Sequence, residues 1–168
     1  MLLDSAGVQT TVSYRTKKVD AIHDAETTES LMFDMIARIS HQMVFVVNDL
    51  TLIEQKYVAM LGEKYAKSKE HKALIVVHNL RTTIDVSEAT MLFERQVMKC
   101  YDGEPSHNGQ LIFTADAGEG ATPVHHIGLC YEFSVAGEKF NAKNREYLLQ
   151  SLEHGRLTAL NTSRYNSI

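Results

Sequence analysis

The chain of 168 residues has no tryptophan, two prolines and two cysteines. So few cysteines exclude a disulfide-stapled scaffold, and the wide separation of Cys100 and Cys130 favours a reduced intracellular protein, which we expect to be cytoplasmic. No apolar run approaches the roughly 18 residues that a membrane-spanning helix needs. The segment from Met1 to Gly7 has neither the basic flank nor the long apolar core of a signal peptide.

The chain also lacks a surplus of basic residues. Its net charge is -4 and its isoelectric point is about 6.0. No clustered basic surface is therefore expected, and we predict that nucleic acid is not a partner. The remaining composition, 44% hydrophobic and 23% charged, is typical of a globular domain. We expect one domain over residues 1–155 and a tail over 156–168, where the apolar periodicity is lost.

Two short apolar runs are the clearest strand signals. They are MVFVV at residues 43–47 and ALIVV at residues 73–77, both rich in β-branched residues and both followed by polar ones. Continuous apolar runs of this length are typical of strands buried on both faces of a parallel sheet. We therefore predict Val44–Val47 and Leu74–Val77 as adjacent, parallel, central strands.

Helical patterns alternate with these strands. Thr51 and Glu54 form the T-x-x-E capping box that predicts a helix start between the two runs. The alternation predicts an α/β fold, with a mostly parallel sheet, right-handed crossovers and helices on both faces. Such sheets bind ligands at the carboxyl ends of their strands. The other expected elements are helices from Thr27 or Thr28 to Ile39, from Asp85 to near Gly103 and from Asn141 to a cap at Gly155, and strands at 111–113 and 124–131.

Motifs at the expected strand ends resemble those of a GTPase domain. In chain order they are LLDSAG, FVVNDLTLIEQ, LIVVHNL and VHHIGLCYEFSVAGEKFN. Together they are similar to the later part of the domain found in dynamin-superfamily large GTPases of the atlastin, guanylate-binding and root-hair-defective kind. The resemblance implies a three-layer P-loop NTPase-like fold that binds GTP together with Mg²⁺.

The resemblance also implies roles for four residues. In D-S-A-G, Asp4 would hold Mg²⁺ through water, and the amide of Gly7 would meet the γ-phosphate, where only glycine allows so close an approach. On the base side, Asn79 would follow the strand that reads guanine. Ser134 would belong to the loop that closes over the base.

The chain departs from the family pattern at three places. It contains no G-x-x-x-x-G-K-[ST], so the phosphate loop is missing. Leu80 and Thr82 stand where the base-reading motif has Lys and Asp. Val8 stands where many GTPases carry the glutamine that orients water, so hydrolysis of GTP stays open. We expect a domain that is incomplete at its N-terminus and exposes apolar surface there. Its partner would be the missing N-terminal part or another protein chain.

Three functions follow from this pattern. The first is a guanine-nucleotide-binding, GTPase-type domain fragment that is inactive as an isolated chain. The second is a pseudo-GTPase that serves as a non-catalytic interaction module. The third, an unrelated α/β enzyme, has the least support because the chain contains neither G-x-S-x-G nor G-x-G-x-x-G.

The histidines and cysteines predict neither a metal site nor a catalytic residue. His125 and His126 are adjacent on an expected strand, so their side chains should point to opposite faces. His78 is expected to be either structural or solvent-facing, and the polar residues of the 20–24 segment are expected to be solvated before a helix. No Cys–His–acid arrangement can be derived from the spacing, and we assign no catalytic residue.

Overall fold

The fold is seen in a computed structural model that describes residues 18–66, 73–98, 109–115 and 123–165. The side chains are described for residues 23–65, 73–97, 109–115 and 123–153. The chain divides into two compact units, residues 1–39 and residues 40–168, and each unit is described by itself. The first contains α1 (Lys18–Ile39). The second contains β1 (Gln42–Val47), α2 (Leu52–Ala66), β2 (Ala73–Leu80), α3 (Val86–Met98), β3 (Ile112–Ala115), β4 (Val124–Cys130) and α4 (Val135–Tyr165).

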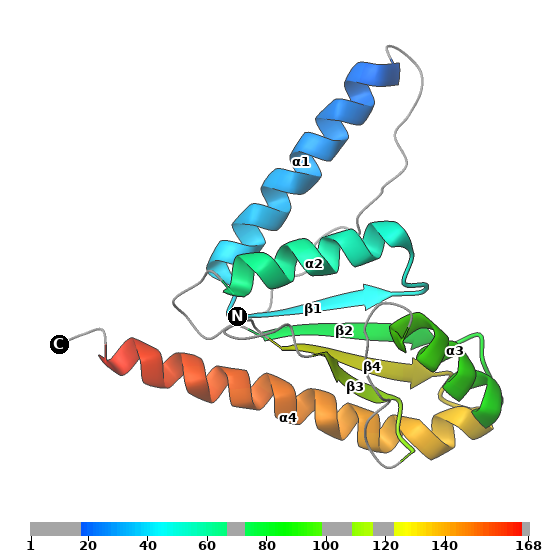
Figure 1. The fold of residues 1–168 in the computed structure, drawn as a ribbon. Helices are drawn as coiled ribbons and strands as arrows, with labels where there is room; N and C mark the ends of the chain where they lie inside the picture. Colours follow the sequence, from blue (N-terminus) through cyan, green and yellow to red (C-terminus); the bar gives the residue numbers. More distant parts are fainter. Residues whose placement is uncertain (1–17, 67–72, 99–108, 116–122, 166–168) are drawn as a thin grey trace. The chain divides into compact units, whose positions relative to one another are not determined.

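The second unit is built on a four-stranded sheet with the order β1-β2-β4-β3. Strands β1, β2 and β4 run parallel, and β3 runs antiparallel to β4 (Figure 1). In the register, Val44 lies opposite Ile75, and Val77 lies opposite Ile127. The predicted α/β class and the parallel pairing of the two apolar runs are therefore confirmed.

Helices cover both faces of this sheet. Figure 1 shows α2 and α4 on opposite sides of it. On the face of α4, a buried core forms where the helix packs on β2 and β4; it contains Ile75, Val77 and Ile127, with Leu129, Tyr147, Leu148 and Leu152 against them. On the other face, α3 contacts β2, and the ring of Phe93 lies 5.2 Å from the ring of His78.

The prediction that both apolar runs are buried on two faces is correct for β2 and wrong for β1. Every residue from Leu74 to His78 is buried, but Val44 is 43% exposed and Val46 is 62% exposed. These two valines lie on the α4 face of the sheet, where the side-chain amide of Gln42, at the start of β1, donates to main-chain oxygens of α4. Within the described residues β1 is also an edge strand, because it pairs with β2 alone.

Two predicted helix starts are confirmed at their caps. The amide of Thr51 donates to the Glu54 carboxylate over 3.0 Å, directly before α2. The Asp85 carboxylate accepts from the amides of Ser87 (2.8 Å) and Glu88 (3.1 Å), directly before α3. Side-chain oxygens at these positions satisfy amides that have no partner within the helix.

The predicted start and end of α4 and the predicted start of α1 were wrong. Helix α4 starts at Val135 rather than near Asn141. It also continues past Gly155 to Tyr165, since a glycine inside a helix lowers its stability by only about 1 kcal/mol relative to alanine. Helix α1 starts at Lys18, so Thr27 and Thr28 lie within it, where each hydroxyl donates to a carbonyl one turn earlier. The predicted end of α3 near Gly103 lies outside the described residues.

Two helical glycines provide a matched test of the packing between α4 and the loop that follows β4. A Cβ added at Gly137 would lie 2.0 Å from the carbonyl oxygen of Tyr131, whereas one added at Gly62 in α2 would meet nothing within 4 Å. We expect Gly137→Ala to lower the free energy of unfolding by about 2 kcal/mol or more, since backbone must move. Gly62→Ala should raise it by roughly 0.5–1 kcal/mol through helix propensity. Urea unfolding of both variants measures the difference, and equal effects would contradict the close approach at Gly137.

Candidate functional site

The candidate site lies where the three parallel strands end. Because β1, β2 and β4 run in the same direction, the residues that follow them meet at one edge of the sheet. Asn48 follows β1, Asn79 lies near the end of β2, and the segment Tyr131–Ser134 follows β4. We call this the carboxyl edge. Asn79 and Ser134 both belong to it, as the sequence predicted.

Two asparagines join the ends of β1 and β2. The side-chain amide of Asn79 donates to the side-chain oxygen of Asn48 over 2.9 Å. Each amide group carries both donors and acceptors, so such a pair can bind a ligand that presents both. Asn48 was not singled out from the sequence, although its place directly after an apolar run was a usable signal.

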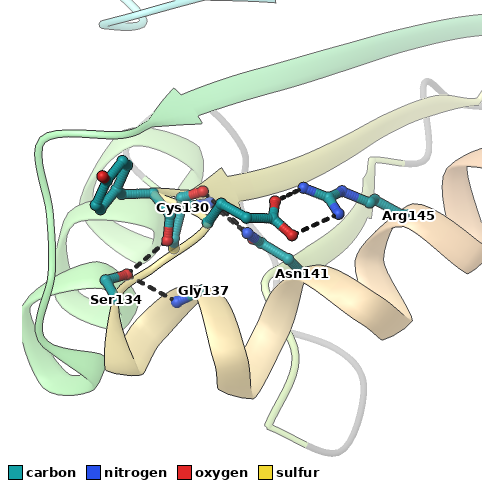
Figure 2. Close-up of polar contacts among 7 residues, drawn as sticks. Cys130, Ser134, Gly137, Asn141 and Arg145 are labelled. Atoms are coloured by element: carbon teal, nitrogen blue, oxygen red, sulfur yellow. Dashed lines mark hydrogen bonds and ion pairs between the residues drawn. The ribbon is translucent and has the colours of Figure 1, made fainter.

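Ser134 caps α4. Its hydroxyl donates to the carbonyl oxygen of Tyr131 (2.7 Å) and accepts from the amide of Gly137 (3.0 Å), as Figure 2 shows. The residue is buried, so both contacts are shielded from water. The hydroxyl therefore has a clear structural role, and its predicted role beside a nucleotide base stays a prediction.

Side chains of α4 fix the loop that follows β4. The amide of Asn141 accepts from the backbone nitrogen of Cys130 (2.9 Å) and donates to its carbonyl oxygen (3.0 Å), as a neighbouring strand would. Arg145 forms a two-pronged ion pair with Glu132 (Figure 2). These contacts hold the loop in one conformation, while the aromatic ring of Phe133 within it is 86% exposed.

The first turn of α4 is occupied by contacts within the chain. The amide of Ala136 donates to the carbonyl oxygen of Ile84 (3.1 Å), which ties the loop after β2 to the start of α4. The amides of Gly137 and Glu138 donate to the hydroxyl and the carbonyl oxygen of Ser134. A helix start binds phosphate through unoccupied amides, so these three do not provide a phosphate cradle.

A chain of polar side chains runs from the carboxyl edge into the sheet. The Gln96 amide donates to the Asp49 carboxylate (3.4 Å), and its oxygen contacts Nδ1 of His78 (2.7 Å). Nε2 of His78 in turn lies 2.9 Å from Nδ1 of His126. Of the two expected roles for His78, structural or solvent-facing, its burial agrees with the structural one, but its partners were not identified from the sequence.

Burial determines the charge of these histidines. It lowers the pKa of His78 to about 4 and that of His126 to about 3, where the neighbouring His78 and His125 add repulsion. Both rings are therefore neutral at pH 7. His125 lies on the opposite face, with Nδ1 3.0 Å from the hydroxyl of Tyr147, so the predicted divergence of His125 and His126 is confirmed.

The structure gives no metal site or reactive thiol in the part of the chain that it describes. No group of three or more His, Cys, Asp or Glu residues within the described ranges is arranged to hold a metal ion. Burial raises the pKa of Cys130 to about 11, so this residue is a thiol at neutral pH. Asp4, Gly7 and Val8 lie outside the described residues, as does Cys100, and the Mg²⁺ role of Asp4 stays a prediction.

Comparisons with known proteins give one distant relative and no family. No protein-family model and no solved structure matches the chain. The chain is similar to a heat shock protein of Dictyostelium discoideum, with 24% identity over 152 residues. The match covers 83% of this chain and 23% of the relative, so the chain spans about a quarter of the relative's length. Among the described helices, none is long and apolar enough to cross a membrane.

Replacement of Ser134 tests whether its role is structural. Ser134→Ala removes the cap of α4, and we expect a loss of about 1 kcal/mol in the free energy of unfolding. The matched control is Ser87→Ala in the first turn of α3, which removes an exposed hydroxyl bond to Asp85 but leaves the backbone amides capped by that carboxylate, and it should cost less than about 0.5 kcal/mol. Chemical denaturation measures both. Equal stability of Ser134→Ala and the parent chain would show that the hydroxyl is not a structural cap.

Proposed function

We propose that the chain is part of a guanine-nucleotide-binding domain of the GTPase kind, in a three-layer P-loop NTPase-like fold. The observation that carries this proposal is the arrangement of the carboxyl edge. Asn79 lies near the end of the parallel strand β2, whose residues from Leu74 to His78 are buried, and the loop with Ser134 follows the neighbouring strand β4. In the proposed domain these two strand ends face the base, and Mg²⁺ lies on the side of Asp4 and Gly7.

The hydrogen bond between Asn79 and Asn48 supports the proposal. It fixes Asn79, near the end of β2, against Asn48, directly after β1, over 2.9 Å, so the side-chain amide of Asn79 has a set orientation at the edge. The contact between Ala136 and Ile84 likewise ties the loop after β2 to the loop after β4. Loops that are held in place before a ligand arrives raise affinity, because less conformational entropy is lost on binding.

The exposed side of β1 also supports the proposal. Val44 and Val46 expose apolar surface on a strand that, in the described part of the chain, has a partner on one side only. An edge strand without Lys, Glu or Pro is rare because it invites pairing with another strand. We infer that a strand with the phosphate loop, absent from these 168 residues, would lie beside β1.

A pseudo-GTPase interaction module is the second candidate. It is favoured by the missing phosphate loop and by the amides of Ala136, Gly137 and Glu138 at the α4 start, which donate to groups within the chain. In this case β1 would pair with a partner protein without any nucleotide. The Dictyostelium relative is named a heat shock protein, a name that gives neither a ligand nor a reaction.

Calorimetry with nucleotides tests the first proposal. Residues 1–168 alone should not bind Mg²⁺-GTP measurably, because the backbone cradle and the lysine that neutralise the phosphates are missing. A longer protein with a phosphate loop ahead of residue 1 should bind GTP in an Mg²⁺-dependent manner. In that protein, Asp4→Ala should weaken the Mg²⁺-dependent part, and Gly7→Ala should reduce the preference for GTP over GDP.

Two outcomes of this titration would count against the proposal. Micromolar binding of GTP by residues 1–168 would contradict the requirement for a separate phosphate loop. A longer protein with an intact loop that binds neither GTP nor GDP would overturn the assignment to this family. ATP serves as the control ligand, since equal affinity for ATP would remove the guanine preference.

Self-association tests the exposed side of β1. We expect residues 1–168 to form oligomers at micromolar concentration, because Val44 and Val46 expose apolar surface on a strand that has no partner on its outer side among the described residues. Val46→Lys should shift the protein toward monomer, since a charged side chain opposes strand pairing. Val135→Lys is the control, because Val135 is similarly exposed, at 68%, but lies on α4. Light scattering after size exclusion measures the mass, and a monomeric parent chain would contradict this expectation.

A further inference from the structure

Two buried histidines contact each other between β2 and β4. His78 and His126 are each 0% exposed, and Nε2 of His78 lies 2.9 Å from Nδ1 of His126. Phe93 of α3 lies against His78, and Phe113 of β3 lies near His126 with 6.1 Å between the ring centres. The chemistry described for the carboxyl edge does not use this pair, so a reason is needed for two titratable groups at the centre of the sheet.

The hydrogen bonds determine where the protons lie. The Gln96 amide nitrogen donates to Asp49, so the Gln96 oxygen faces His78 and can only accept. Nδ1 of His78 therefore carries the proton. In a neutral ring Nε2 is then an acceptor, so Nδ1 of His126 must donate to it. Every donor in the chain from His126 to Asp49 thus points toward the carboxyl edge.

This arrangement limits how many protons the pair can hold. One extra proton can be accommodated, because His126 can change its tautomer and accept from a protonated His78. With two extra protons, N–H groups on both rings would face each other across the 2.9 Å contact. Two positive charges would also lie together in a buried site, which is strongly unfavourable. The closed arrangement therefore excludes the doubly protonated pair.

We propose that the His78–His126 pair is a proton-controlled latch that holds α3 against the sheet. While both rings are neutral, His78 holds Gln96 of α3, and Gln96 holds Asp49 at the carboxyl edge. When both rings are protonated, the contact opens, α3 separates from β2, and Asp49 loses its partner. This inference is independent of the proposed nucleotide function.

The groups around the pair favour the neutral state. From α3, the pair meets the uncharged Phe93 and Gln96; from β3, it meets Phe113. From β4, His125 is the neighbouring titratable group, and its charge would repel a proton on His126. The carboxylate connected to the pair is Asp49, which follows β1 and acts through Gln96.

The sign of the pH dependence follows from these contacts. An exposed histidine has a pKa of about 6.5, whereas burial lowers the pKa of His78 to about 4 and that of His126 to about 3. The open state therefore binds more protons at every pH between about 6.5 and 4, so opening is favoured as the pH falls. With two protons taken up, the opening constant rises by up to roughly 100-fold per pH unit in this window.

Native-state hydrogen exchange in urea tests the latch. We expect protection of the amides in α3 to fall roughly 10²- to 10³-fold between pH 7.5 and 5.0, after correction for intrinsic exchange. The free energy of this opening should depend only weakly on urea concentration, because α3 alone separates and little surface is exposed. The β2 amides should exchange through a larger opening, whose free energy depends more steeply on urea concentration. If α3 and β2 show the same protection and the same urea dependence at both pH values, the pair affects only global stability and the latch is wrong.

Two variants isolate the role of His126. In His126→Asn the side-chain amide can replace Nδ1 as donor to His78, but it does not titrate, so the fall in α3 protection should shrink to roughly 30-fold. His125→Asn is the control on the opposite face and should keep the full pH dependence. A full pH dependence in His126→Asn would overturn the proposal. Should that variant not fold, nitrogen NMR of the histidine rings in the unmodified chain at pH 7 tests the proposal, because it reports which ring nitrogen carries the proton. A proton on Nε2 of either ring would contradict the latch.

Discussion

The fold depends on the burial of β2. This strand pairs with β1 on one side and β4 on the other, and its side chains from Leu74 to His78 are all buried. A strand in this position needs cover on both faces, which α3 and α4 supply. The same requirement buries a polar residue, His78, at the end of an apolar run. It must find partners there, and it finds them in Gln96 and His126.

At the carboxyl edge, hydrogen bonds and an ion pair fix the loops, while some side chains face solvent. Asn141 and Arg145 fix the loop after β4, and the amide of Ala136 ties the start of α4 to the loop after β2. The amides of Ala136, Gly137 and Glu138 are occupied by contacts within the chain, so these three do not provide a phosphate cradle. Asn79 and Asn48 form an exposed polar pair at this edge.

Local sequence patterns predicted the helix starts correctly where a contact between residues close in the sequence determines them. Thr51 with Glu54 and Asp85 with the amides that follow it start helices where expected, since a capping contact spans only a few residues. Local patterns failed where the decision depends on distant contacts. Gly155 suggested a helix end, but α4 continues. Val44 belongs to an apolar run that is typical of a strand buried on both faces of its sheet, but Val44 is partly exposed. Whether a helix covers the face of the sheet on which Val44 lies depends on where α4 crosses the sheet.

The sequence by itself determined the α/β class, the parallel pairing of the two apolar runs and the position of Asn79 at the end of β2, because hydrophobic periodicity and strand-end position are local properties. Only the tertiary structure decided that β1 lies at the edge of the described sheet, that the hydroxyl of Ser134 caps α4, and that His78 contacts His126. The two histidines are 48 positions apart, and Asp49 and Gln96 are 47 apart. Periodicity predicts which face a side chain occupies, but the register between strands and the packing of a helix decide which residue it meets there.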